Sequence, residues 1–235
     1  LKGRVHADEA RAARAHTKNK LKFTLPGPMT LIDTIADKYY GDRVKMAFAF
    51  AELLNEEAKA LQADGVDVIQ FDEPAFNVYM DQVRDWGIKA LERAAQGPTC
   101  ATAVHICYGY GIKANNDWKK TLGGEWRQYE ETFPAIAASP IQQVAIECRN
   151  SRVPLELLGL LKGKVIQAGC IDVASDEVET PDDVVKTIEA VMKHVPKDKI
   201  VATTNCGMAP MRRDIAEAKL QALGAGAKLA RTRLG

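Results

Sequence analysis

Short apolar runs alternate along the whole chain with segments in which apolar residues recur every three or four positions. The runs are continuous rather than strict alternations of apolar and polar residues, which is typical of parallel strands covered on both faces. They predict six parallel strands, at residues 22–26, 66–72, 101–107, 142–147, 164–171 and 200–205.

The segments between these runs predict helices. Apolar residues at three- and four-residue spacing between Thr30 and Asp64 predict one long helix, which Gly65 ends. At Thr180 a capping residue is followed by a proline and, three positions later, by an acid, which indicates a helix start. Further helices are expected at residues 4–17, 83–96, 125–138 and 153–161, and from about 210 to 223, where Gly224 ends the last one.

Polar or reactive residues follow almost every predicted strand. They are Asp72 and Glu73, His105 and Cys107, Glu147, Asp172, and Asn205 and Cys206. Functional residues at the carboxyl ends of many parallel strands are typical of one α/β fold, the (β/α)8 TIM barrel, in which these ends form the mouth of the barrel. An open doubly wound sheet is the alternative, but such sheets often carry a glycine-rich first turn, which this sequence lacks. Because six strands are two fewer than a closed barrel needs, we expect this chain to lack one or two N-terminal βα units.

The composition is that of an ordinary globular domain. Of the 235 residues 27% are charged and the formal net charge is +1, so no nucleic-acid partner is expected. No apolar run approaches the roughly 18 residues of a membrane span, and the first residues do not resemble a secretory signal. The five scattered cysteines argue against a disulfide framework and fit the cytoplasm. Without a Pro/Gly linker, we expect a single domain over residues 1–235.

His105 and Cys107 stand two residues apart at the end of an apolar run, so they point to the same face of a strand. Taken alone, the pair is more simply a buried polar residue beside a buried thiol. Further ligand types at two later strand ends, Glu147 and Cys206, favour a metal site. Together the four residues offer one nitrogen, one oxygen and two sulfur donors, all of which zinc accepts.

Two thiolates and a carboxylate over-neutralise Zn²⁺, so such a metal activates water poorly. It can instead bind a substrate thiol, lower its pKa and leave the sulfur nucleophilic. The set therefore favours alkyl transfer to a thiol over hydrolysis. A structural Cys/His zinc is the alternative, but its ligands usually come as closely spaced pairs on loops.

Five stretches carry a resemblance to a known family: FTLPGPMTL, VIQFDEPAF, HICY, AIEC and TNCGM, the last followed by a basic helix. In order and content, from about Lys22 to Gly224, they resemble the catalytic C-terminal barrel of the cobalamin-independent methionine synthases, in a short single-barrel form. The resemblance implies a barrel of the uroporphyrinogen-decarboxylase-like superfamily that transfers a methyl group to homocysteine to give methionine. It matches His105, Cys107, Glu147 and Cys206 to the zinc ligands of the family, and Asp72 to the acid that holds the amino group of homocysteine.

The sequence departs from the long, two-barrel enzymes where the methyl donor and the proton donor are expected. The tryptophan that stacks on folate falls near Thr34, and an acid that contacts folate falls near Val78. Ala174 stands where the acid/base histidine should follow the IDV segment, so no catalytic residue is assigned. The upstream homocysteine-binding segment and a second acid are expected before Leu1. The donor is therefore either methyltetrahydrofolate or a methylated corrinoid such as methylcobalamin, with or without a partner protein.

Other residues leave two interpretations open. Asp172 either takes over the role of the missing histidine or caps the loop that follows it, and Glu73 is expected to position the loop before Pro74. Cys148 adjoins Glu147, so on a regular strand it faces the opposite way and is expected to be inert. Residues 108–126 predict a long loop, which is either a lid or donor-docking surface or a surface loop without a role.

Two other functions remain open from the residues alone. One is a zinc barrel that completes its site with a partner protein, which the loss of the histidine favours. The other is a methyltransferase for a different small thiol. Asp72 argues against it, because an acid at that position suits an α-amino group.

Overall fold

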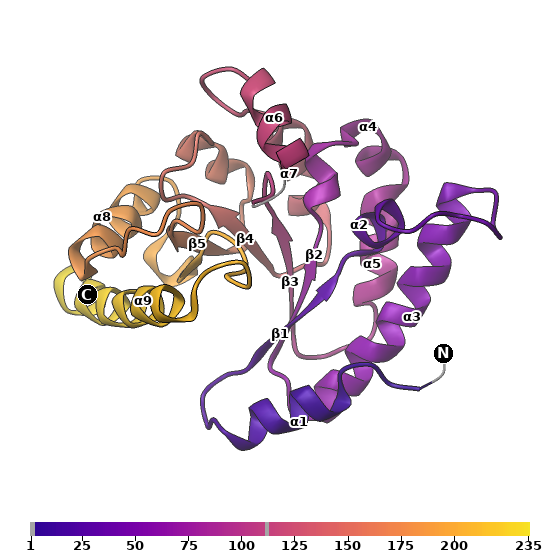
Figure 1. The fold of residues 1–235 in the computed structure, drawn as a ribbon, viewed down its shortest axis with the longest axis horizontal. Helices are drawn as coiled ribbons and strands as arrows, with labels where there is room; N and C mark the ends of the chain where they lie inside the picture. The colour runs from indigo at the N-terminus through magenta and orange to yellow at the C-terminus, as the bar shows by residue number, and fades with distance from the viewer. Residues whose placement is uncertain (1–2, 111–112) are drawn as a thin grey trace. The chain divides into compact units, whose positions relative to one another are not determined.

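The computed structural model describes residues 3–110 and 113–235 (Figure 1). The described chain alternates strands and helices and divides into two compact units. The first unit comprises Leu1–Ile106 and Pro134–Gln143, and the second comprises Cys107–Phe133 and Val144–Gly235. No helix in the described ranges is both long and apolar enough to cross a membrane.

The first unit contains three parallel strands in the order β1-β2-β3. Its elements are α1 (Ala7–Ala15), β1 (Lys22–Pro26), α2 (Pro28–Asp33), α3 (Arg43–Ala63), β2 (Val68–Asp72), η1 (Pro74–Asn77), α4 (Met80–Gln82), η2 (Val83–Gly87), α5 (Ile88–Ala95) and β3 (Ala101–Ile106). Helices α3 and α5 pack against each other, as Figure 1 shows. A small apolar core lies between α2, α3 and α5, and its residues are Ile32, Met46, Ala47 and Ala90, flanked by Phe48, Phe50 and Trp86.

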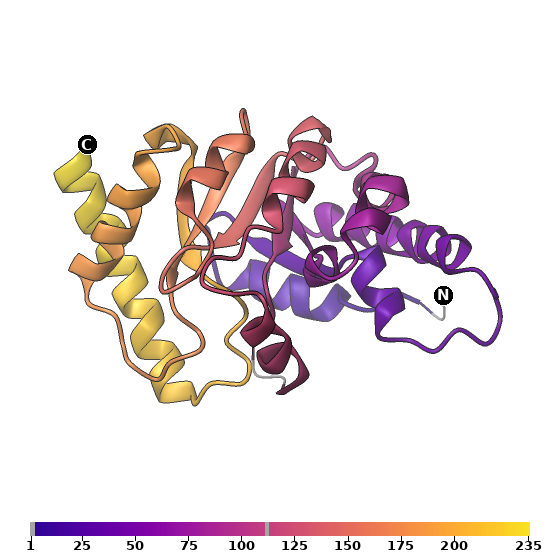
Figure 2. The same ribbon diagram turned by 90° about the horizontal axis from the view of Figure 1, so that it is seen from above.

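The second unit holds the strands in the order β4-β5-β6, with β5 and β6 paired in parallel. Its elements are α6 (Lys113–Thr121), η3 (Leu155–Leu160), β5 (Val165–Ile171), α8 (Pro181–Met192), η4 (Lys197–Lys199), β6 (Ile200–Thr204) and α9 (Arg213–Leu234). Helix α7 (Tyr129–Ala138) and strand β4 (Gln143–Glu147) each begin in one unit and end in the other. Helices α8 and α9 lie side by side in both ribbon views (Figures 1 and 2).

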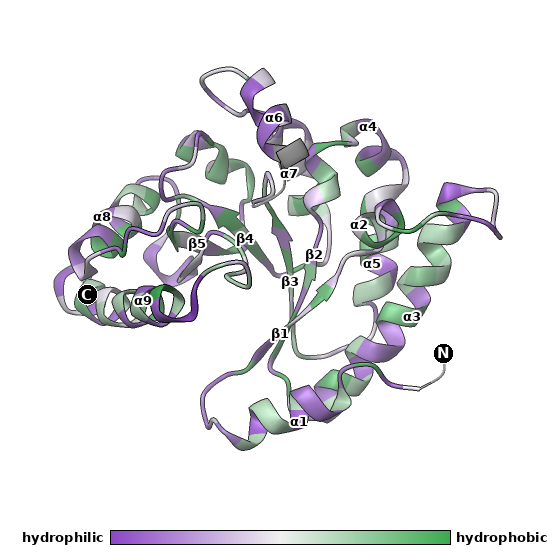
Figure 3. Cartoon of the chain, viewed as in Figure 1, coloured by the Kyte–Doolittle hydropathy of each residue, from purple (hydrophilic) through white to green (hydrophobic). Residues whose placement is uncertain are grey.

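The prediction of six parallel strands is confirmed, because each predicted run contains one strand of the structure. The strands are one or two residues shorter than some of the runs. The predicted helix start at Thr180 is also confirmed: Thr180 and Asp183 form a reciprocal capping box at the start of α8. Figure 3 shows the hydropathy behind this pattern, with β3 largely hydrophobic and α6 largely hydrophilic.

The prediction of one helix from Thr30 to Asp64 is wrong, because α2 and α3 are separate. Helix α2 ends at Asp33, and α3 begins only after Asp42, whose side chain accepts hydrogen bonds from two backbone N–H groups of the first turn. An aspartate cap ends the loop and starts a new helix, which an apolar spacing pattern does not reveal.

The expected end of the last helix at Gly224 is wrong as well, since α9 continues to Leu234. A second glycine in this helix, Gly226, has a packing role. A Cβ atom at Gly226 would lie 2.4 Å from Cβ of Val184 in α8. The small residue therefore allows α8 and α9 to approach closely, and packing outweighs the low helix propensity of glycine.

Glu73 is fully buried and holds the start of α2. Its carboxylate accepts hydrogen bonds from the backbone N–H of Met29 (3.0 Å) and of Thr30 (2.8 Å), and from the Thr30 hydroxyl (2.8 Å). A Cβ atom on Gly27, the residue before the helix, would lie 2.1 Å from the Glu73 side chain, so this position needs glycine. The expected positioning role of Glu73 thus extends to the preceding βα connection.

Replacing Glu73 with glutamine tests how this buried carboxyl affects stability at different pH values. Burial raises the pKa of Glu73 to about 7 from 4.5, so the folded state binds this proton more tightly than the unfolded state. The free energy of unfolding should therefore fall by about 2–3 kcal/mol as the pH rises from about 4.5 to about 7. Glu73→Gln should lack this decline. Urea unfolding over this pH range measures it, and parallel pH profiles for the two proteins would contradict the assignment.

Candidate metal centre

Two cysteine thiols face each other in the second unit. Cys107 directly follows β3 in the sequence, and Cys206 lies just after the end of β6. Their Sγ atoms are 3.7 Å apart. Two sulfur ligands of a tetrahedral zinc ion, each about 2.3 Å from the metal, lie about 3.8 Å from each other. The pair therefore has the spacing that two thiolates adopt on one zinc ion.

The surroundings of Cys107 oppose its ionisation. The adjacent Cys206 thiol, burial and the negative charge of Glu147 raise the pKa of Cys107 well above its usual range. The Cys107 side chain is only 3% exposed. Like charges repel strongly in such a site, so two thiolates and a carboxylate can coexist only beside a positive charge. A divalent cation supplies that charge and binds the same atoms.

Glu147 ends β4 and is 2% exposed. Each of its carboxylate oxygens accepts a hydrogen bond from the segment that follows Cys107. Oε1 accepts one of 3.0 Å from the backbone N–H of Tyr108, and Oε2 accepts one of 2.6 Å from the hydroxyl of Tyr110. The carboxylate is therefore fixed in orientation by two donors, as ligating carboxylates usually are.

His105 is the penultimate residue of β3, and only Ile106 separates it from Cys107. The imidazole is 5% exposed. Side chains two residues apart in an extended chain point to the same side, so the local backbone directs the His105 imidazole and the Cys107 thiol the same way. Ligand atoms of His105, Cys107 and Cys206 lie within 4.8 Å of one another and could hold a metal ion, whereas Glu147, the fourth predicted ligand, is not part of this group, so the four-residue set stays a prediction.

Asp72 ends β2 next to His105. In the parallel β2–β3 register the two residues are aligned, so their side chains lie on the same face of the sheet. Oδ1 of Asp72 accepts a hydrogen bond of 2.8 Å from Gln70, whose own side-chain oxygen accepts one of 2.7 Å from Lys22. Burial lowers the pKa of Lys22, and the charge of Asp72 opposes that shift. A half-buried acid is thus held at the strand end that also carries His105.

Asn205 connects the chain before Cys206 to the chain after Glu147. Its side-chain oxygen accepts a hydrogen bond of 3.2 Å from the backbone N–H of Cys148, and its Nδ2 donates one of 2.8 Å to the carbonyl oxygen of Arg149. Asn205 is 1% exposed. The buried amide therefore limits how far the ends of β4 and β6 can separate.

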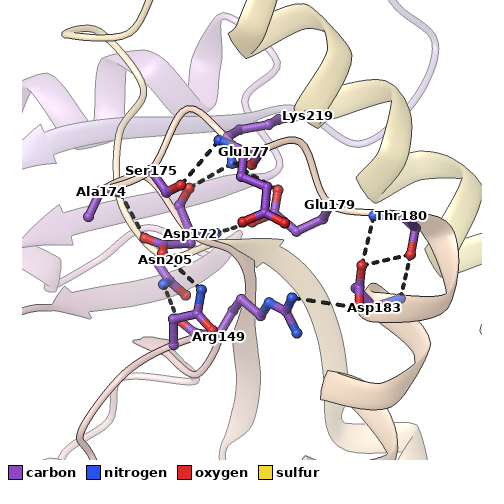
Figure 4. A network of polar contacts seen from close by, with 11 residues as sticks. Arg149, Asp172, Ala174, Ser175, Glu177, Glu179, Thr180, Asp183, Asn205 and Lys219 are labelled. Atoms are coloured by element: carbon purple, nitrogen blue, oxygen red, sulfur yellow. Dashed lines mark hydrogen bonds and ion pairs between the residues drawn. The ribbon is translucent and has the colours of Figure 1, made fainter.

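Figure 4 shows the polar network at the carboxyl end of β5. One carboxylate oxygen of Asp172 accepts a hydrogen bond of 2.8 Å from the backbone N–H of Ala174, and the other accepts one of 3.0 Å from Nδ2 of Asn150. Of the two roles expected for Asp172, the structure shows the capping of the following loop.

Lys219 of α9 is fully buried and anchors the same loop (Figure 4). Its Nζ donates to the carbonyl oxygens of Asp172 (2.9 Å) and Glu177 (2.5 Å) and pairs with the carboxylate of Glu179 at 2.9 Å. Glu179 also accepts a hydrogen bond of 2.8 Å from the backbone N–H of Asp172. The loop that carries Ala174 is therefore tied to α9 by a satisfied buried ion pair.

The prediction that residues 108–126 form a loop is wrong for the part that contains α6. Residues 111–112 of this segment lie outside the described residues. The ring of Trp118 in α6 stacks on Tyr108, with 5.7 Å between ring centroids, and Tyr108 also packs against Trp126 and Tyr129. Aromatic packing stabilises a helix whose own sequence has weak helix propensity.

The remaining cysteines differ from this pair. None of the five cysteines, all within the described ranges, forms a disulfide. Burial raises the pKa of both Cys148 and Cys170. The thiols donate to the carbonyl oxygens of Ile146 and Ala168, respectively. The raised pKa values favour the protonated form of both thiols, and the inertness of Cys148 stays a prediction.

Sequence reasoning missed Tyr110 and Lys219. Tyr110 lies inside a stretch predicted as loop, and no spacing rule links it to Glu147. Lys219 lies on a predicted helix, where a lysine is ordinarily exposed. Its place among the apolar positions of α9 was the available signal that this lysine is buried.

These features define a partial (β/α)8 barrel whose strands carry thiol, imidazole and carboxylate groups at or just after their carboxyl ends. A family model described as the catalytic domain of cobalamin-independent synthase matches residues 3–229. The chain belongs to this family, that of the cobalamin-independent methionine synthases.

Named relatives agree with this assignment. A methionine synthase of Saccharolobus solfataricus is 30% identical over 223 residues, which are 94% of this chain and 61% of the relative. A methionine synthase of Sulfurisphaera tokodaii is 27% identical over 220 residues, covering 94% of this chain and 59% of the relative. This chain thus spans about three fifths of the length of these relatives.

A solved structure has the same fold over nearly the whole chain. It is a B12-independent methionine synthase from Shewanella sp. W3-18-1, solved in complex with selenomethionine. It is 55% identical and has a TM-score of 0.95, covering 99% of this chain and 68% of that protein. The expected barrel fold is therefore confirmed, in the partial form that this chain contains.

Removing either thiol of the Cys107–Cys206 pair tests the metal centre. Cys107→Ser and Cys206→Ser should each lose most of the bound zinc, because a neutral hydroxyl is a poor replacement for a thiolate ligand. Cys100→Ser, outside the pair, is the control and should retain the metal. Metal analysis after gel filtration measures the zinc content. One zinc ion per chain in both pair variants would refute the assignment.

Replacing Lys219 with methionine should destabilise the protein by about 3–5 kcal/mol, because Glu179 would remain buried without its cation. Lys186→Met is a matched control on α8: it removes an exposed ion pair with Asp183 and should cost less than about 1 kcal/mol. Chemical denaturation of the three proteins gives the comparison. Equal losses for both variants would show that the Lys219 pair does not hold the loop.

Proposed function

We propose that this chain is the zinc-binding catalytic part of an enzyme that transfers a methyl group to the thiol of homocysteine and so forms methionine. The observation that carries the proposal is the 3.7 Å spacing of the Cys107 and Cys206 sulfur atoms. The family assignment and the methionine synthases among the relatives support the same reaction. So does the selenomethionine bound to the Shewanella protein, since it is an analogue of the product.

The proposed zinc ligands are His105, Cys107, Glu147 and Cys206. A bound zinc ion would supply one kind of chemistry here: it would lower the pKa of the homocysteine thiol and keep the sulfur nucleophilic. The donors of this chain set that property, because two thiolates and a carboxylate would donate electron density to the zinc ion, which would then withdraw little from the substrate sulfur. Burial of Cys107 and Glu147 limits the access of water to these donors.

Asp72 is proposed to bind the ammonium group of homocysteine. It is a half-buried carboxylate at the end of β2, aligned with His105 in the β2–β3 register. This alignment puts the ammonium-binding group and a metal ligand on one face, as a short amino acid with a terminal thiol requires. The acid also favours homocysteine over small thiols that lack an amino group.

The methyl donor is proposed to be methyltetrahydrofolate or a methylated corrinoid, taken directly or from a partner protein. Ala174 has no proton-donating side chain, and Asp172 is engaged as a loop cap. The proton that a folate leaving group needs would thus come from outside this loop, whereas a methylated corrinoid needs none.

An assay of methionine formation tests the proposed function. Homocysteine is supplied with methyltetrahydrofolate in one reaction and with methylcobalamin in the other, each with zinc-loaded protein. Methionine in either reaction supports methyl transfer and identifies the donor. A zinc-loaded protein that methylates a thiol without an amino group equally well would instead favour a different small-thiol acceptor. Methionine formed only after a second protein is added would favour a partner-dependent subunit.

Substituting Asp72 tests the acceptor site. A charged hydrogen bond to the substrate ammonium contributes on the order of 1.5–3 kcal/mol, so Asp72→Asn should weaken homocysteine binding roughly ten- to a hundredfold. Zinc content should not change, because Asp72 is not a proposed ligand. Isothermal titration with homocysteine measures the affinity, and Asp67→Asn is a carboxylate control at the other end of the same strand segment. An unchanged affinity in folded Asp72→Asn would rule out the binding role.

A further inference from the structure

We propose that Tyr110 is a positioning residue for Glu147: its phenol sets the orientation in which this carboxylate serves the metal centre. The inference rests on the proposed function, because it concerns one of the proposed zinc ligands. Tyr110 lies after β3, in the segment 108–126 that the sequence analysis expected to be a loop, and the proposed chemistry gives this residue no role.

The contact between the two residues is short and part-buried. The Tyr110 hydroxyl donates to Oε2 of Glu147 at 2.6 Å, within the range of strong hydrogen bonds to carboxylates. The backbone N–H of Tyr108 occupies Oε1 at 3.0 Å. Because the donors bind different oxygens, they fix both the position and the plane of the carboxylate.

Tyr110 is itself held in place by α6. Nζ of Lys119 lies 4.8 Å from the centroid of the Tyr110 ring, a cation–π distance. The same ammonium donates a hydrogen bond of 2.7 Å to the carbonyl oxygen of Gly109. One lysine of α6 thus fixes the backbone before Tyr110 and the ring of Tyr110 together.

The chemical consequence follows from the lone pairs of a carboxylate. Each oxygen can accept one hydrogen bond and still offer a lone pair to a metal. Donors that orient a ligating carboxylate typically contribute ten- to a hundredfold, roughly, to metal affinity. Glu147 is 2% exposed, so without the phenol its Oε2 would lose its hydrogen-bond donor in a buried place. Only the hydrogen bond from Tyr108 to Oε1 would then hold the carboxylate, which could pivot about that contact.

The experiment is a double-mutant cycle with zinc affinity as the readout. Wild type, Tyr110→Phe, Glu147→Gln and the double variant are titrated with zinc against a chelator of known affinity. Tyr110→Phe should weaken zinc binding roughly ten- to a hundredfold. In the Glu147→Gln background the same substitution should have little further effect, because a residue that acts through Glu147 cannot act without it.

Two further measurements separate positioning from general destabilisation. The cobalt(II) form of Tyr110→Phe should show altered ligand-field bands, as those of Glu147→Gln should. Tyr39→Phe is the matched control, since Tyr39 is 89% exposed, and should leave both readouts unchanged. Should Tyr110→Phe fail to fold, Lys119→Met replaces it in the cycle, because it removes the support of Tyr110 but leaves the phenol in the chain.

The outcomes distinguish this inference from the proposed function. The positioning role is overturned if Tyr110→Phe keeps wild-type zinc affinity, or if the substitution lowers zinc affinity equally in the wild type and in Glu147→Gln. Either result leaves the metal centre unaffected. A wild-type chain that binds no zinc, or binds it independently of Glu147, overturns the proposed ligand set and this inference with it. A loss of zinc affinity that occurs only when Glu147 is present, together with altered cobalt bands, supports the role of Tyr110.

Discussion

Two thiols and a carboxylate near one another in a buried site repel each other once they ionise, and the candidate site is built around that repulsion. Cys206, burial and Glu147 raise the pKa of Cys107 for this reason. A divalent cation removes the repulsion, and the 3.7 Å between the sulfur atoms matches two thiolates on one zinc ion. By the same charge balance, a zinc ion bound here would activate water poorly, which is why the proposed function assigns it a substrate thiolate.

Neutral hydrogen bonds join the strand ends that carry Glu147 and Cys206, and a buried ion pair holds the neighbouring loop after β5. The amide of Asn205 joins the chain before Cys206 to the chain after Glu147. The ion pair between Lys219 and Glu179 fixes the loop after β5. Each partner is buried and hydrogen-bonded, so the groups cost little to bury together, whereas removing one would leave the other uncompensated.

The interpretation of the loop after β5 bears on the reaction. Ala174 has no titratable side chain, and both carboxylate oxygens of Asp172 accept hydrogen bonds, one from Ala174 and one from Asn150. For the proposed function this means that the groups assigned to the acceptor are present in this chain, whereas no group of this loop is assigned to proton transfer. The proposal of a donor whose leaving group needs no proton rests on that difference.

The sequence by itself determined the six strands and the start of α8, and it predicted the candidate ligands. These follow from local patterns: apolar runs, a capping box, and reactive residues at strand ends. It did not determine the break between α2 and α3, the passage of α9 through Gly224, or the role of Tyr110. Helix spacing does not reveal the aspartate cap at α3, the close packing of Gly226 on Val184 or the phenol on Glu147. The last two join residues about forty positions apart, and only tertiary packing decides which distant residues meet.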